Sequence, residues 1–204
     1  GGMMKRLPEI FCPAVLEGSH IRLNLLAEKD FERLFEAASD PLIWEQHPAK
    51  DRYREEKFKK YFLEALETGS SFLAEDRISG KVIGSTRYYE YSPETDSVCI
   101  GYTFLTREFW GGSYNREMKT LMLDFAFQHI SRVLFHISAD NHRSYRACEK
   151  MGARRIREFQ KESGEVFLPY FEYEIRREDW DGNEQWLGKD SRQGTDDLSI
   201  KWRK

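Results

Sequence analysis

Several signals that often direct a first interpretation are scarce in this chain of 204 residues. It holds only three cysteines, Cys12, Cys99 and Cys148, an odd number without the paired spacing of metal-binding motifs. We therefore expect no disulfide framework, and we expect a reducing, cytoplasmic setting. No apolar run approaches the roughly 18 residues of a membrane-spanning helix, and no secretory signal pattern is visible.

The charges show no bias toward one sign. Lysine and arginine together number 32, against 35 aspartate and glutamate residues, and the signs are interspersed, which gives a net charge of −3. Such a balance gives no reason to expect a nucleic-acid or membrane partner. With 40% hydrophobic residues, the composition agrees with a soluble enzyme.

The length is sufficient for one domain with a substantial core. We expect this domain over residues 17–180, between an N-terminal arm (1–16) and a polar C-terminal tail (181–204). The first two residues, glycines ahead of a methionine, read as a cloning remnant. The tail is expected to be mobile, or to dock through Trp186 and Trp202.

The hydrophobic pattern alternates between helical and strand periods, which predicts a mixed α/β domain. Apolar residues at helical spacing predict helices over residues 28–38, 54–67 and 113–129 and a further helix after residue 141. Strands are predicted over residues 17–26, 71–76, 81–91, 97–105, 133–137, 153–162 and 166–175, the last two forming a hairpin.

One junction carries the strongest functional signal. The strand predicted over residues 97–105 leads through Thr-Arg-Glu-Phe-Trp-Gly-Gly into a helix that opens at Ser113. The N–H groups and the dipole of such a helix N-terminus favour a phosphate group. Arg107, Arg116 and Lys119 are expected to surround the turn with positive charge. The turn is neither a Walker A loop nor a GxGxxG dinucleotide fingerprint.

A second motif follows the next predicted strand. The order of this motif and the glycine-containing turn along the chain is informative. The motif residues are Trp110, Gly111, Tyr114, Asn141, Ser144, Glu149, Lys150 and Gly152. Over about residues 16–180 the chain thereby resembles the GCN5-related N-acetyltransferase (GNAT) superfamily, and within it the branch of ribosomal-protein N-terminal acetyltransferases. The resemblance implies a single-domain GNAT fold, with a central, mostly antiparallel twisted sheet flanked by helices.

The resemblance also implies a cofactor and the residues that bind it. In this family the glycine-containing loop cradles the pyrophosphate of acetyl-CoA, the preceding strand bonds the pantetheine arm, and the Asn-x-x-Ser helix flanks the thioester. The implied cofactor-binding residues are Phe104, Leu105, Thr106, Trp110, Gly111, Gly112, Ser113, Tyr114, Asn115, Asn141, Ser144 and Lys150. The co-substrate is acetyl-CoA and no metal is implied.

The chain departs from the family pattern at four positions. Ser113 and Asn115 replace a glycine and a small residue of the loop, but both are good helix N-caps, so phosphate binding by the main chain is expected to survive. Cys148 stands where many members have the tyrosine that acts as general acid, and Cys99 where many have a glutamate.

Acetyl transfer needs a neutral amine, a base, and a donor near the departing sulfur. Asn141, Ser144, Tyr145, Cys148 and Gly152 would share one stripe of a helix, which by resemblance faces the thioester. We expect Ser144 to be the donor, with Cys148 and Tyr145 as less favoured candidates.

The candidate bases are two carboxylates. Strand alternation places Glu90 on one face with Thr86 and Tyr88. Glu45 lies with His47 in an irregular segment that often lines the acceptor cleft in this family. For all three of Glu90, Glu45 and His47, a structural or solvated role is the alternative. Three further histidines share no ligand spacing, so no metal is expected; they are His129, His136 and His142.

The sequence thus predicts an acetyl-CoA-dependent N-acetyltransferase whose acceptor amine attacks the thioester directly. The acceptor would be a protein N-terminus or a small amine such as a polyamine, amino acid or aminoglycoside. The alternative is a CoA-binding sensor or interaction module without turnover, which the changes at Ser113, Asn115 and Cys148 keep open. A different acyl group is a third possibility. The protein is expected to be a monomer or a homodimer.

Overall fold

A single mixed sheet organises the molecule. The computed structural model describes residues 4–163, 166–182 and 199–201, and their nine strands follow the order β7-β8-β6-β5-β4-β3-β2-β1-β9. Only β5 and β6 pair in parallel, so the sheet is mostly antiparallel. The strands are β1 (Val15–Glu17), β2 (Ile21–Leu25), β3 (Ser71–Asp76), β4 (Val82–Ser92), β5 (Ser97–Leu105), β6 (Arg132–Ser138), β7 (Arg154–Ser163), β8 (Val166–Arg176) and β9 (Ser199–Lys201).

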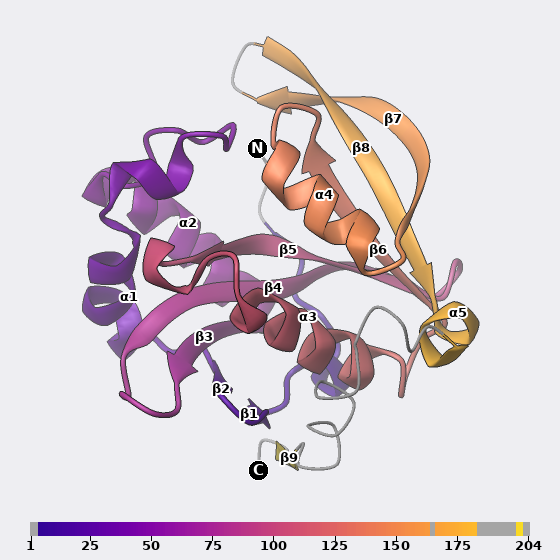
Figure 1. The fold of residues 1–204 in the computed structure, drawn as a ribbon, viewed down its shortest axis with the longest axis horizontal. Coiled ribbons are helices and arrows are strands. Elements are labelled where there is room, and N and C mark those ends of the chain that lie inside the picture. The colour runs from indigo at the N-terminus through magenta and orange to yellow at the C-terminus, as the bar shows by residue number, and fades with distance from the viewer. Residues whose placement is uncertain (1–3, 164–165, 183–198, 202–204) are drawn as a thin grey trace.

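Helices cover the sheet on its two faces, which confirms the predicted fold class. Figure 1 shows α3 and α4 in front of the sheet. The α-helices are α1 (Phe31–Ala38), α2 (Glu55–Thr68), α3 (Ser113–Ala126), α4 (His142–Lys150) and α5 (Arg177–Gly182), and the short 3-10 helices are η1 (Glu9–Phe11), η2 (Glu28–Asp30), η3 (Pro41–Trp44) and η4 (Arg107–Phe109). No helix within the described ranges is long and apolar enough to cross a bilayer.

Two hydrophobic cores hold these layers together. One core lies under α3, where Met118, Met122 and Phe125 pack against apolar side chains of the sheet. The other lies under α1 and α2 and centres on Trp44 and Phe58. Successive side chains of a strand point to opposite faces of the sheet, and here helices cover each face. The central strands are therefore buried on both faces.

The first predicted strand is wrong in one respect: residues 17–26 are not one strand. They contribute the end of β1, a turn over residues 18–20, and β2, with the Gly18 N–H donating to the carbonyl of Ile21 at 2.8 Å. Gly-Ser is a turn signal, and the apolar alternation around it hid the reversal of the chain. Glu117 of α3 secures this turn by accepting the His20 backbone N–H at 3.0 Å.

The sheet divides at its single parallel pair. Residues 97–99 of β5 pair with residues 132–134 of β6, and the pairing stops there. β5 then bends: Tyr102 has a φ of 53°, and the β4–β5 register shifts next to it, between Ser85 and Arg87. The two strands diverge in Figure 1, and α4, which follows β6, lies over the gap. The gap leaves one edge of β5 without a partner strand.

The C-terminal end of the domain is fixed by Trp180. Its side chain is 2% exposed, and its indole Nε1 donates to Asp124 Oδ1 of α3 at 2.7 Å. Further along, β9 pairs with β1 at the edge of the sheet, whereas Trp186 and Trp202 lie outside the described residues. The boundary at residue 180 stays a prediction.

A pair of shortened chains tests that boundary. We expect a chain ending at residue 182 to fold, because Trp180 and its bond to Asp124 are retained. Replacing Trp180 by Ala in that shortened chain should lower the free energy of unfolding by about 3–5 kcal/mol, the scale of a large aromatic removed from a core. Urea unfolding monitored by circular dichroism measures both. Insolubility of the shortened chain with Trp180 intact would place the tail in the core.

Candidate active site

Two cavities meet where the sheet divides. The larger, about 1010 Å³, lies between the end of β5, the loop before α3, and α4. The smaller, about 370 Å³, is lined by β5, β6, α2 and the β7–β8 hairpin. Five residues line both cavities, and we call them the junction: His47, Thr103, Lys119, Asn141 and Ser144. Ligands bound in the two cavities would therefore meet next to these five residues.

The loop before α3 presents backbone rather than side chains to the larger cavity. Gly111 adopts a φ of 72°, and a Cβ at Gly111 or Gly112 would meet no heavy atom within 4 Å. Gly112 is the N-cap of α3, and no side chain caps the helix. The helix begins at Ser113 as predicted, and Ser113 and Asn115 are its first and third residues rather than its N-cap. The uncapped N–H groups and the helix dipole suit an anion.

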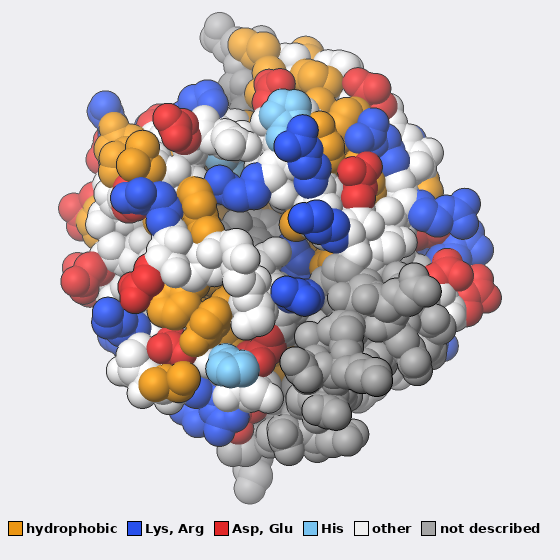
Figure 2. Space-filling model, in the orientation of Figure 1, with side chains coloured by type: hydrophobic (Ala, Val, Ile, Leu, Met, Phe, Trp, Pro, Cys, Tyr) orange, Lys and Arg blue, Asp and Glu red, His pale blue; other side chains and the backbone are white. Residues whose placement is uncertain are grey.

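Positive charge surrounds the larger cavity, as Figure 2 shows near the centre of this face. The cationic side chains in its lining, apart from the junction, are Arg116, Arg143, Arg146 and Lys150. Arg143 is held over the ring of Trp110, with its guanidinium carbon 3.6 Å from the ring centroid.

Two of the three cations expected around the turn have other positions. Arg107 pairs with Asp40 on the surface, and it lies outside the lining of the larger cavity. Lys119 is buried at the junction, deeper than expected. Arg116 lines the larger cavity as predicted.

Most of the predicted cofactor-binding residues gather in this cavity. Its lining includes Phe104, Leu105, Trp110, Gly111, Gly112, Asn115, Asn141, Ser144 and Lys150. Three predicted residues lie outside the lining. Thr106 uses its N–H in a bond to Ile83, and Tyr114 turns away to bond Asp76 at 2.9 Å. Ser113 is exposed and does not line the cavity.

At the start of α4, Asn141 and Ser144 face the junction. The Asn141 Oδ1 atom is buried and has no hydrogen-bond partner among the described residues, so it is available to an N–H donor of a ligand. Tyr145, one position on, instead bonds His142 and packs on Phe171. Cys148 lies in the core, where burial raises the pKa of its thiol to about 12. Of this predicted stripe, only Asn141 and Ser144 reach the cavities.

The two candidate bases differ in position. Glu45 is exposed and lines neither cavity, so the structure does not bring it into the cleft. Glu90 is also exposed, but its carboxylate lies 3.9 Å from Cys99 Sγ. The alternation predicted for β4 fails at Glu90, because this residue has a φ of 49° and the β4–β5 register shifts between Tyr89 and Ser92. A bulge of this kind redirects a side chain.

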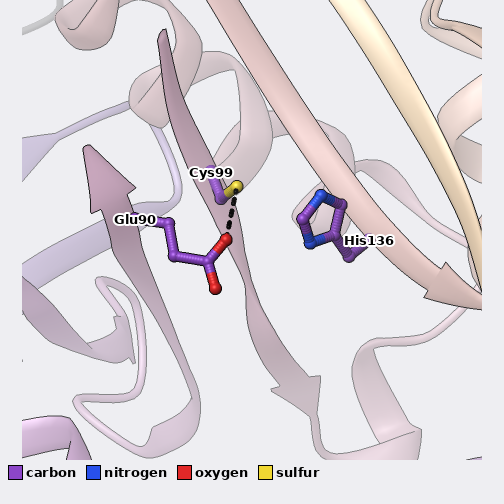
Figure 3. Close-up of side chains that lie close together, drawn as sticks. All are labelled: Glu90, Cys99 and His136. Atoms are coloured by element: carbon purple, nitrogen blue, oxygen red, sulfur yellow. Dashed lines mark hydrogen bonds between the residues drawn. The ribbon is translucent and has the colours of Figure 1, made fainter. Parts of the chain in front are cut away.

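His136 completes a cluster that spacing in the sequence did not predict. Figure 3 shows Glu90, Cys99 and His136 turned toward one another from three adjacent strands, with ligand atoms within 4.8 Å of one another. Burial raises the pKa of the Cys99 thiol, and Glu90 adds to that effect. His136 lines the smaller cavity. The expectation that the protein carries no metal stays a prediction.

Behind this cluster, Glu172 holds the imidazole of His136 in place. The Nε2 atom of His136 lies 2.7 Å from Glu172 Oε2, and Arg157 donates to the other carboxylate oxygen at 2.9 Å. Burial alone would raise the pKa of Glu172, but the hydrogen bonds from Arg157 and His136 outweigh it and lower that pKa. β8 thus supplies a charged support for a side chain of β6.

At the junction, His47 is neutral. Burial, reinforced by the charges of Arg52, Lys161 and Lys50, lowers the pKa of His47 to about 3. Its Nδ1 accepts the Ala49 N–H at 3.0 Å, so the proton of the neutral ring lies on Nε2. A ring in this state can donate one hydrogen bond through Nε2, and its capacity as a base is low.

The sequence comparison gives one family. A family model described as an acetyltransferase (GNAT) domain matches residues 20–154. No curated protein sequence matches the chain significantly.

Solved structures share the fold along most of the chain. A putative acetyltransferase from T. thermophilus is 27% identical, with a TM-score of 0.69 over 88% of this chain and 95% of that one. A ribosomal-protein-S5-alanine acetyltransferase from Vibrio fischeri is 18% identical, with a TM-score of 0.63 over 81% and 98%. Mycobacterium smegmatis RimJ in complex with CoA-disulfide is 14% identical, with a TM-score of 0.69 over 95% and 99%. At the last two identities, the likeness shows the fold.

The neutral state of His47 predicts a pH dependence of stability. The pKa of His47 is about 3 in the folded protein, against a usual value of 6.5. Between these two pH values, the imidazole is therefore protonated in the unfolded chain but neutral in the folded chain. Stability from this residue is therefore complete above pH 6.5 and is lost as the pH falls toward 3, by on the order of 1.4 kcal/mol per pH unit.

Urea unfolding at pH 7.5 and pH 5 measures this loss in the wild type and in His47→Gln. The variant should lose less stability than the wild type over the same interval, while all other titrating groups are common to both proteins. An equal loss in the two proteins would show that His47 is protonated in the folded state.

Proposed function

We propose, from the premise that this chain belongs to the GNAT acetyltransferase family, that it transfers an acetyl group from acetyl-CoA to a primary amine. The amine attacks the thioester directly. The observation that carries the proposal is the meeting of two cavities at one junction in the split of the sheet. Two substrates that enter from opposite sides would meet there.

Acetyl-CoA suits the larger cavity. The uncapped N-terminus of α3 and the cations in the lining offer partners to the pyrophosphate. The unpaired Oδ1 of Asn141 offers an acceptor to an amide N–H of the pantetheine arm. The free edge of β5 next to the split supports a further main-chain contact with that arm. The thioester would then lie at the junction, beside Ser144.

The acceptor amine would occupy the smaller cavity, which opens onto the same junction. We assign Glu90 as the base, acting through water, because its carboxylate lies beside His136, a residue of the cavity lining. Glu90 also brings a carboxylate next to Cys99, where many relatives have a glutamate. The acceptor is a protein N-terminus or a small amine, and a panel of both classes is the experiment that decides.

Alanine substitutions at two glycines with similar backbone conformations test the binding of acetyl-CoA. Gly111 and Gly80 both have positive φ values, 72° and 75°, and open space around the position of a Cβ. Replacing either by Ala should therefore introduce similar strain. Acetyl-CoA at 100 times its Kd should stabilise the wild type by about 2.7 kcal/mol, and only Gly111→Ala should weaken this effect.

Thermal unfolding with and without acetyl-CoA gives the comparison, and Gly80→Ala, in the β3–β4 turn, is the matched control. No rise in Tm of the wild type at millimolar acetyl-CoA would exclude the cofactor. A rise in Tm without CoA release on any peptide or small amine of the panel would favour the sensor without turnover.

Ser144 is the proposed hydrogen-bond donor to the departing sulfur. Ser144→Ala should lower kcat by about 10- to 1,000-fold, the scale for loss of one positioned donor. The Kd for acetyl-CoA should change little, because the proposed contacts with the pyrophosphate and the pantetheine arm do not involve Ser144. Cys148→Ala is the control, since Cys148 is buried in the core and lines neither cavity. Wild-type turnover in Ser144→Ala would remove its catalytic role.

A further inference from the structure

Lys119 is an unusual side chain for its position. It lies on the face of α3 that packs against the sheet, it is 9% exposed, and it lines both cavities. Lysine is almost never buried to this extent without a partner, because its charge loses hydration. Within the described part of the chain, its Nζ forms no ion pair or side-chain hydrogen bond; its one close neighbour of this kind is the ring of Phe135, 5.5 Å away.

The other residues of the junction give Lys119 no counter-charge. Thr103, Asn141 and Ser144 are uncharged side chains, and His47 is neutral. Burial lowers the pKa of the Lys119 ammonium, and the Cys148 thiol behind it opposes that effect. An unpaired cation in this setting is costly to the free protein. The position of Lys119 suits a cation whose counter-charge forms on a bound substrate during the reaction.

Acetyl transfer creates one such charge at the junction. When the thioester breaks, its electron pair moves to the sulfur of CoA, and a nearby cation stabilises the thiolate far more in a buried site than in water. The family's usual acid is replaced at its own position by Cys148, whose side chain is directed into the core. Ser144 of the same helix can donate a hydrogen bond to the sulfur, but a serine hydroxyl is too weak an acid to give up its proton, so the proton itself is left to another group.

We propose that Lys119 is a catalytic residue whose ammonium contacts the sulfur of CoA and protonates it as it departs. This inference rests on the proposed function. The acceptor nitrogen forms a bond to the carbonyl carbon, and the bond from that carbon to sulfur breaks. The sulfur takes the electron pair and then a proton from Lys119 Nζ. The base removes one proton from the acceptor, so the reaction releases CoA as a thiol and Lys119 regains its proton from solvent.

The first test is turnover. Lys119→Met preserves the length of the side chain and removes its charge, and it should lower kcat about 100-fold or more. Its Tm should equal or exceed that of the wild type, because a buried charge is removed. Lys59→Met is the matched control, since Lys59 is an exposed lysine of α2 that lines neither cavity. Near-wild-type kcat in Lys119→Met would overturn the proposal.

The second test reports contact with sulfur without any turnover. The wild type should bind CoA more tightly than desulfo-CoA, which lacks the thiol, and this preference should be reduced in Lys119→Met, where Ser144 still contacts the sulfur, but unchanged in Lys59→Met. Isothermal titration calorimetry measures these affinities. A wild type without preference for CoA, or a preference of unchanged size in Lys119→Met, would overturn the contact. The absence of a preference in the wild type would do so even if Lys119→Met does not fold.

A third measurement separates a donor from a nucleophile. If Lys119 were itself acylated, peptide mass spectrometry after incubation with acetyl-CoA would find an acetyl group on its Nζ, and the donor role would be overturned. We expect an unmodified lysine. A wild type that binds acetyl-CoA but acetylates no acceptor contradicts the proposed function, whereas the comparison of CoA with desulfo-CoA still decides the contact of Lys119.

Discussion

The separation of β5 from β6 is the constraint on which the rest of the molecule depends. The two strands pair over three residues and then part, so backbone groups that a sheet would normally satisfy become available to a ligand. The helices that follow each strand, α3 after β5 and α4 after β6, consequently begin on the two sides of one opening. Both cavities adjoin this opening, and four of the five junction residues come from these two strand–helix units, while His47 comes from the segment after η3.

The junction is defined as much by its electrostatics as by its shape. His47 is kept neutral by burial and by surrounding cations, Asn141 has an unpaired oxygen, and Lys119 has a positive charge without a negative partner among the described residues. The unpaired oxygen of Asn141 and the unpaired charge of Lys119 lower the stability of the empty protein, and His47 does so below pH 6.5. Together they describe a site whose hydrogen bonds and charges are completed by ligands, which is how an acyl-transfer site lowers the energy of a developing anion.

The smaller cavity, which we propose as the acceptor site, has a different construction. Glu90, Cys99 and His136 come from three adjacent strands, and Glu172 and Arg157 support the imidazole from the β7–β8 hairpin. This hairpin follows the cofactor-binding motifs in the chain, yet it contributes Lys161 and Tyr170 to the smaller cavity. The smaller cavity therefore combines segments from residue 47 to β8, whereas the larger cavity is built chiefly from two consecutive strand–helix units, η3 and the segment after it.

Local patterns of periodicity and turn chemistry were enough to predict the order of helices and strands, the loop at Gly111 and the helix that begins after Asn141. It could not place Glu90, since a bulge changes the face on which a strand residue lies. It also missed the hairpin within residues 17–26 and the orientation of Tyr114. The burial of Lys119 and the grouping of His136 with Glu90 and Cys99 became apparent only in the folded molecule. Burial and contacts between distant strands depend on packing, which no local pattern encodes.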